Sequence, residues 1–411
     1  MFMNKQIRET HRPCLIVGLA LLFILAGCAH TNQSDLFYED TQKAIHIEIE
    51  KILDNKDLKK ESFKLSEIAD SITYIKLGSR NDKGEEGFLT KARKIFWTGD
   101  YIVVNDFTTV LLFDKAGNFL RQLGQRGEGP NEYLWAEGTA VDIPNKKVYI
   151  GSETKVVAYD FNNHFINSFP IKEEFDRMEF LENGKLLINR PNLYGMLKNK
   201  LSLIDSAGNI LKSYPNYYNF TPYTNEIAVV ALDNVTENFY KRPKRVLYKE
   251  AYNDTIFSFD SHYELVPAIY LNLRKYTVPV HLRSEYLGKR EVIERECNNC
   301  YLTFTTETDN YFMVECRPVN TANHTLKLVV CNKTSKVCFY TEQPIINDLD
   351  NGPDILPSGI TPDGKYIYAW ISCPRFTEMV EKKDNISASL AAFAETVGED
   401  DNLIIIKIKL K

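Results

Sequence analysis

The sequence lacks the features that define several large classes of protein. Its 50 Lys and Arg do not outnumber its 55 Asp and Glu, so the formal charge of −5 provides no basic surplus for a nucleic-acid backbone. With 20 Gly and 16 Pro in 411 residues, the chain is neither collagen-like nor of low complexity. Because 44% of the residues are hydrophobic, there is enough apolar surface to build a core. We expect a globular protein with no nucleic-acid partner.

Sequence signatures of catalysis are also missing. The seven His residues form no His-x-x-x-His pair, and the chain has neither a Gly-x-Ser-x-Gly elbow nor a Gly-Lys-Ser/Thr phosphate loop. We therefore predict no catalytic residue and expect no resident cofactor.

The chain has a single long apolar run, from Cys14 to Ala26, which follows a basic start. At a rise of 1.5 Å per residue, this run spans about 20 Å and is too short to cross a hydrocarbon core of about 30 Å. Such a pattern is typical of a secretory signal peptide. The run ends in Leu25-Ala26-Gly27-Cys28, which resembles the bacterial lipobox, in which the cysteine is acylated. An ordinary signal peptide is the alternative.

These features predict a signal peptide over residues 1–27 and lipidation of Cys28. The membrane is then a partner through the lipid anchor, and the localisation is the cell envelope. Ala29 after the cysteine favours the outer membrane over the inner one. Residues 28–62 are polar and mixed in charge, so we expect a tether that docks at most one short helix near residues 44–53.

The rest of the chain repeats one pattern, in which two strands and a Gly or Asn turn lead to a third strand. Copies of the pattern begin near Tyr101, Lys147, Lys185, Thr255, Tyr311 and Tyr366. A unit of three or four short strands cannot bury both of its faces alone, and radial stacking of such units around an axis solves that problem. We predict an all-β fold over residues 63–411, a six-bladed β-propeller with short helical insertions. The alternative is a pair of β-sandwich domains.

Two segments of the sequence predict how the propeller closes and which family the chain resembles. Ile72–Leu77 precedes the first full unit and is expected to complete the last blade. Residues 95–170 resemble NHL-type repeats. The run Phe119–Tyr133 (FLRQLGQRGEGPNEY) and the opening Phe63–Leu77 (FKLSEIADSITYIKL) are similar to the six-bladed β-propeller lipoproteins of Bacteroidetes. This resemblance implies the propeller fold and a Gram-negative cell envelope, and it supplies no catalytic residue.

A glycine-rich segment follows the first unit. Gly124, Gly127, Gly129 and Pro130 lie within seven residues. Exposed backbone N–H groups in such a loop can cradle an anion. The interpretation that we favour is a structural loop that leads from one blade to the next.

No cysteine lies between Cys28 and Cys297, and six lie in the last 115 residues. A symmetric hairpin would place Cys331 opposite Cys338, so this pair is the candidate disulfide. Buried free thiols and a metal at Cys297 and Cys300 are the alternatives. The sequence leaves the states of Cys316 and Cys373 open.

The leading functional hypothesis is a non-catalytic binding or scaffold module for a protein, peptide or glycan partner. Charged segment 281–296 and segment 374–401 are predicted helical insertions, and insertions in repeat proteins often form the binding face. The alternative is a metal-dependent propeller hydrolase or lactonase that holds calcium at the axial channel. Its candidate ligands end strands expected to be innermost, and they are Asn105, Asp106, Glu153 and Asn189.

Overall fold

The computed structural model describes residues 33–173, 175–190, 192, 196–217, 219, 238–242, 245–250, 253–279, 295–320, 325–398 and 400–411. The predicted signal peptide, Cys28 and most of the predicted insertion at 281–296 lie outside these residues. Residues Gln33–Lys411 form one compact unit.

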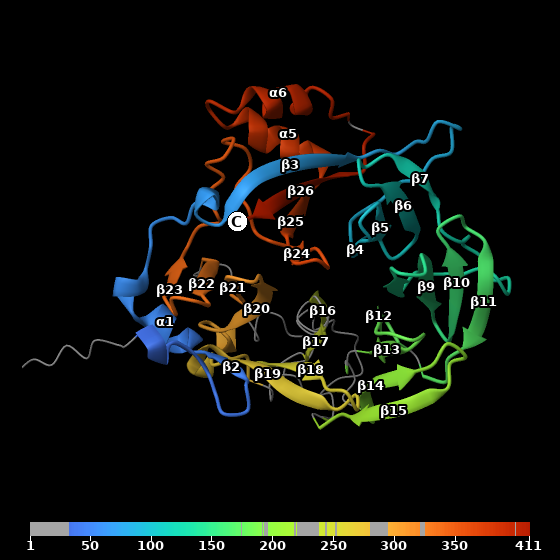
Figure 1. Ribbon diagram of the computed structural model, residues 1–411, viewed down its shortest axis with the longest axis horizontal. Helices are drawn as coiled ribbons and strands as arrows, with labels where there is room; N and C mark the ends of the chain where they lie inside the picture. Colours follow the sequence, from blue (N-terminus) through green and yellow to red (C-terminus); the bar gives the residue numbers. More distant parts are fainter. Residues whose placement is uncertain are drawn as a thin grey trace, which may run out of the picture. The chain divides into compact units, whose positions relative to one another are not determined.

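Six sheets surround a common axis in this unit, so the predicted six-bladed β-propeller is confirmed (Figure 1). The first blade consists of β4 (Lys94–Trp97), β5 (Tyr101–Asn105), β6 (Val110–Asp114) and β7 (Phe119–Gln122). The second consists of β8 (Gly138–Asp142), β9 (Lys147–Ser152), β10 (Lys155–Asp160) and β11 (Phe165–Pro170). The third consists of β12 (Arg177–Phe180), β13 (Leu186–Asn189), β14 (Asn199–Ile204) and β15 (Ile210–Pro215). The fourth blade consists of β16 (Asn238–Arg242), β17 (Arg245–Lys249), β18 (Thr255–Phe259) and β19 (Leu265–Leu271). The fifth consists of β20 (Tyr301–Glu307), β21 (Tyr311–Pro318), β22 (Lys327–Asn332) and β23 (Cys338–Thr341). The last consists of β24 (Gly359–Ile360), β25 (Tyr366–Ile371), β26 (Leu403–Leu410) and β3 (Ala69–Leu77).

The strand nearest the axis in each blade is one that the sequence repeat did not include. Most copies of the repeat begin at the second strand, such as β5 or β9, and the copy near Thr255 begins at the third strand, β18. Three of the inner strands are short, with four residues each in β4 and β12 and two in β24. Such segments are too brief to give a clear strand pattern in the sequence.

The last blade is closed by a strand from the opposite end of the unit. β3 pairs antiparallel with β26, and the register runs from Leu77 opposite Leu403 to Ile72 opposite Ile408. The predicted closure by Ile72–Leu77 is therefore confirmed. This pairing removes the free edge that an open ring would leave.

The segment before β3 is packed rather than polar. β1 (Phe37–Glu39) and β2 (Ile45–Ile47) extend the sheet of the fourth blade, where β2 runs parallel to β19. The helix α1 (Ile49–Asp54) buries Ile49 and Ile52. The apolar side chains of this segment share a core cluster with the fourth and fifth blades. The short docked helix expected near residues 44–53 is present as α1. The polar tether predicted over residues 28–62 is otherwise wrong from Leu36 onward, because the apolar side chains of this segment cover an apolar surface.

Short helical elements complete the unit. The 3-10 turns are η1 (Gln33–Asp35), η2 (Lys56–Leu58), η3 (Leu65–Glu67) and η4 (Arg274–Tyr276). Two α-helices between β25 and β26, α5 (Cys373–Glu381) and α6 (Ala388–Ala394), form the insertion that the sequence predicted after residue 374. Phe376 of α5 and Phe393 of α6 pack on Tyr74 of β3, so this insertion covers the closure strand.

An Asp-x-x-Gly-Asn turn locks neighbouring blades together. In the first blade, Asp114 Oδ1 accepts hydrogen bonds from the N–H groups of Ala116 and Asn118. Gly117 has φ +93°, and a Cβ there would overlap the carbonyl oxygen of Lys76 in β3. Gly208 contacts Pro170 of the second blade in the same way. The glycine therefore permits close approach to the outer strand of the preceding blade.

We expect Gly117→Ala to lower the free energy of unfolding by more than about 2 kcal/mol, because it adds a clash with β3 to the cost of a left-handed residue. The matched control is Gly99→Ala, where φ is +88° and no atom lies within 4 Å of the added Cβ. This control should cost about 1 kcal/mol. Urea unfolding measures both variants, and equal losses would contradict the proposed contact.

Candidate functional site: the axial cavity

The axis of the propeller contains a cavity of about 190 Å³. The inner strands of all six blades contribute to its lining, along with residues such as Tyr368 and Trp370 of β25. Its charged lining residues are four basic side chains and two acidic ones, namely Arg93, Lys94, Lys241, Arg242, Glu179 and Glu307. The cavity is therefore positive in a chain that is negative as a whole.

Glu179 is the most buried charge in the cavity. Its side chain on β12 is 2% exposed, and it contacts Lys94 Nζ of β4 at 2.8 Å and Lys241 Nζ of β16 at 3.5 Å. Burial would raise the pKa of Glu179, but the two ammonium groups outweigh burial and hold this pKa below its ordinary value. One carboxylate thus connects three blades across the axis.

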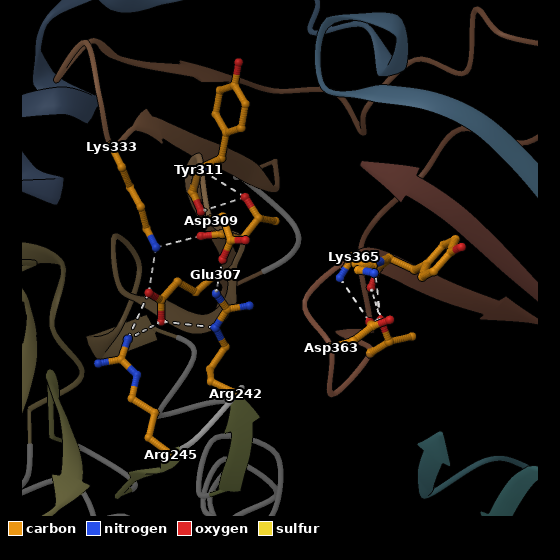
Figure 2. Close-up of polar contacts among 11 residues, drawn as sticks. Arg242, Arg245, Glu307, Asp309, Tyr311, Lys333, Asp363 and Lys365 are labelled. Atoms are coloured by element: carbon orange, nitrogen blue, oxygen red, sulfur yellow. Dashed lines mark hydrogen bonds and ion pairs between the residues drawn. The ribbon is translucent and has the colours of Figure 1, made fainter. Parts of the chain in front are cut away.

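A second ionic cluster forms around Glu307 at the end of β20 (Figure 2). Arg245 Nη2 donates to both carboxylate oxygens at 2.9 and 2.8 Å, and Lys333 Nζ donates at 2.7 Å. Arg242 Nε lies 3.7 Å from the same carboxylate. Burial opposes ionisation, yet these cations keep the pKa of Glu307 below its ordinary value. The cluster joins the fourth blade to the fifth.

The turn between β24 and β25 lies apart from this cluster in Figure 2. Asp363 Oδ1 accepts a hydrogen bond from Thr361 Oγ1 at 2.6 Å and another from the Lys365 N–H at 3.1 Å. Its carboxylate therefore serves its own turn, and it is not joined to Glu307 by any hydrogen bond in the described structure.

The four metal ligands nominated from the sequence do not form one site. Asn105 Nδ2 donates to the Ala136 carbonyl at 2.9 Å, and Asp106 Oδ1 accepts from the N–H groups of Thr108 and Thr109. Asn189 Nδ2 donates to the carbonyl of Lys200 at 2.9 Å.

These nominated residues end or follow the second strands β5, β9 and β13 and are not on the inner strands, and Glu153 is exposed in a turn. The sequence placed them at the channel because the true inner strands were missed. Across the residues that the structure describes, no three His, Cys, Asp or Glu side chains are grouped so as to hold a metal ion.

The glycine-rich loop between β7 and β8 satisfies its own backbone. Gly124 N–H donates to Asn163 Oδ1 at 2.6 Å, and Gly127 N–H donates to the carbonyl of Tyr133 at 3.0 Å. Gly129 N–H donates to Glu132 Oε2 at 2.9 Å, so a carboxylate of this chain occupies the place that an external anion would take. Pro130 lies in the tight turn that these bonds enclose.

The cysteines lie away from the cavity. Cys331 and Cys338 form a disulfide between paired positions of β22 and β23, with 4.2 Å between their Cα atoms. Cys297, Cys300, Cys316 and Cys373 are buried free thiols. Burial raises the pKa of Cys316, which makes it a poor nucleophile.

The fold and the cavity define the class of protein, which is a six-bladed β-propeller with a small charged axial cavity. A family model described as "Domain of unknown function (DUF4934)" matches residues 45–409, and the chain belongs to that family. No curated protein sequence matches the chain.

The chain is similar to solved structures, and one of them shares its fold. One is a Bacteroides fragilis NCTC 9343 protein described as exported, with a TM-score of 0.64, 16% identity, and coverage of 86% of this chain and 99% of the other. Another is a DUF4221 member from Bacteroides vulgatus ATCC 8482, with a TM-score of 0.44, 12% identity, and coverage of 84% and 97%. Within the described ranges, every helix is too short or too polar to cross a membrane.

We expect Glu179→Gln to lower the free energy of unfolding by about 3 kcal/mol at pH 7. The substitution leaves the ammonium groups of Lys94 and Lys241 in the cavity without their carboxylate partner. The folded pKa of Glu179 is lowered, so its contribution is present above about pH 4.5 and is lost as the pH falls through the folded pKa. The stability gap between wild type and variant should therefore narrow in acid. Urea unfolding at several pH values measures the gap.

The matched control is Glu61→Gln, at an exposed residue outside the cavity, which should leave stability unchanged at every pH. A gap for Glu179→Gln that stayed constant from pH 7 to pH 3 would contradict the ionic role of Glu179.

Proposed function

We propose that this protein is a lipid-anchored module of the bacterial cell envelope that binds a protein, peptide or glycan partner without catalysing a reaction. Its anchor is Cys28 and its membrane is the outer membrane. Its blades are NHL-like repeats of the kind found in Bacteroidetes lipoproteins. The fold, the lipobox-like sequence and a protein of the same fold that is described as exported support this proposal.

The observation that carries the binding role is the construction of the axial cavity. Every blade contributes an inner strand to it, and its charged side chains form ion pairs rather than a nucleophile with an adjacent base. Trp370 lines this cavity and is 37% exposed, so the lining includes an aromatic side chain that solvent reaches. Exposed aromatic residues beside a pocket are frequent binding hot spots.

Binding can be tested with the full chain in detergent on arrays of oligosaccharides and peptides. We expect at least one saturable partner, and we expect Trp370→Ala to weaken that partner at least tenfold because it removes the aromatic contact. The control is Phe88→Ala, which removes a side chain that is 56% exposed and does not line the cavity. Turnover of the array ligand, or equal loss in both variants, would count against the proposal.

The anchor is tested separately by supplying labelled fatty acid to a Gram-negative host that produces the full chain. The wild-type chain should incorporate the label and sediment with membranes, whereas Cys28→Ser should not incorporate it, since the acylated thiol is gone. Cys14→Ser, in the same leader, is the matched control and should keep the label. Label that persists in Cys28→Ser would rule out this anchor.

A further inference from the structure

Arg242 has one guanidinium nitrogen that the protein leaves unused. The residue is 8% exposed at the end of β16, where Nε faces Glu307 and Nη2 lies 3.5 Å from Asp309 Oδ1. Nη1 is buried and has no hydrogen-bond acceptor. In Figure 2, the guanidinium directs this remaining nitrogen away from both carboxylates. A buried charged donor without an acceptor lowers the stability of the folded protein, so an acceptor bound at Nη1 would be stabilising.

A second buried donor of the cavity lining is in the same condition. Trp97 of β4 is 5% exposed, and its Nε1 has no acceptor. Among the lining residues, the buried side-chain atoms without a partner are these two, and both are donors. The unsatisfied buried side-chain groups in the described lining are therefore hydrogen-bond donors, which a ligand with acceptor oxygens would satisfy.

The charges of the cavity lining also favour an anionic ligand. Glu179 is already neutralised by Lys94 and Lys241, and Glu307 is already neutralised by Arg245 and Lys333. Arg242 therefore shares Glu307 with two other cations, and its second carboxylate partner, Asp309, is 82% exposed. Burial lowers the pKa of Arg242, and the acidic neighbours only partly offset that effect, so an added anion would stabilise its charged form.

We propose that the axial cavity binds an oxyanion, a carboxylate, sulfate or phosphate group of a small ligand or of a chain end, with Arg242 Nη1 as its principal donor and Trp97 Nε1 as the second. This inference rests on the proposed binding role and names the ligand chemistry at that site. A volume of about 190 Å³ admits one acidic group with its nearest atoms and excludes a folded domain. Guanidinium groups bind all three oxyanions through the same planar array of donors.

The test is calorimetric titration of the full chain in detergent with sodium galacturonate, sodium sulfate and sodium phosphate, each at constant ionic strength. The neutral sugar galactose is the ligand control. We expect one of the three anions to bind saturably at one site per chain and galactose not to bind. The anion that binds distinguishes an acidic sugar from a sulfated or phosphorylated ligand.

Variants assign the donors. Arg242→Gln should weaken the anion at least tenfold, and Trp97→Phe should weaken it about threefold while keeping an aromatic ring in place. Arg80→Gln, at a side chain that is 67% exposed and outside the cavity, should have no effect. If Arg242→Gln does not fold, Trp97→Phe still tests the site, because it removes the Nε1 donor and keeps an aromatic ring.

Two outcomes would overturn the inference. One is an anion that binds equally to wild type, Arg242→Gln and Trp97→Phe. The other is no anion binding by a chain that still binds a partner on the arrays, in which case the binding role stands and the oxyanion site fails. If the chain bound neither an anion nor a partner on the arrays, the proposed function would be contradicted as well.

Discussion

The fold depends on one pairing, that of β3 with β26. Each blade presents its faces to its neighbours, so a ring with one blade incomplete would expose an apolar face and a free strand edge. The eight paired positions between Leu403 and Leu410 bring the two ends of the unit into one sheet. Ile75 and Ile405, opposite each other in this pairing, are both buried. The axial cavity exists only because the ring is closed, and the ionic contacts across it depend on that closure.

The sequence predicted the middle of each blade better than its inner edge. The second and third strands are mostly unbroken apolar runs, such as those of β6 and β10, and they meet at turns with Asp, Gly or Asn, so pattern and turn chemistry agree. The inner strands lack both signals. Arg177–Phe180 follows an irregular stretch, and Gly359–Ile360 is shorter than one period of alternation. The packed segment from Leu36 was missed for a related reason, because its apolar residues are spread among polar ones.

The same omission hid the site. Asn105 and Asp106 attracted attention as polar residues after a strand, but both serve the turn that they begin. The charged residues that do line the axis come from inner strands of different blades, and Lys94 and Glu179 are 85 residues apart in sequence. No local spacing connects them, so only the closed ring brings them together. Charged residues within or next to short apolar segments, such as Lys94 and Glu179, were the one available signal.

The segment Leu36–Asp54 also determines how the ring would carry mechanical load. A pull on the chain ahead of Gln33 reaches the β1–β2 hairpin and α1 before it reaches β3. These elements are held by the parallel pairing of β2 with β19 and by apolar side chains buried between two blades. Tension from that end is therefore resisted by the fourth and fifth blades, and the strand that closes the ring lies beyond the point where the force is absorbed.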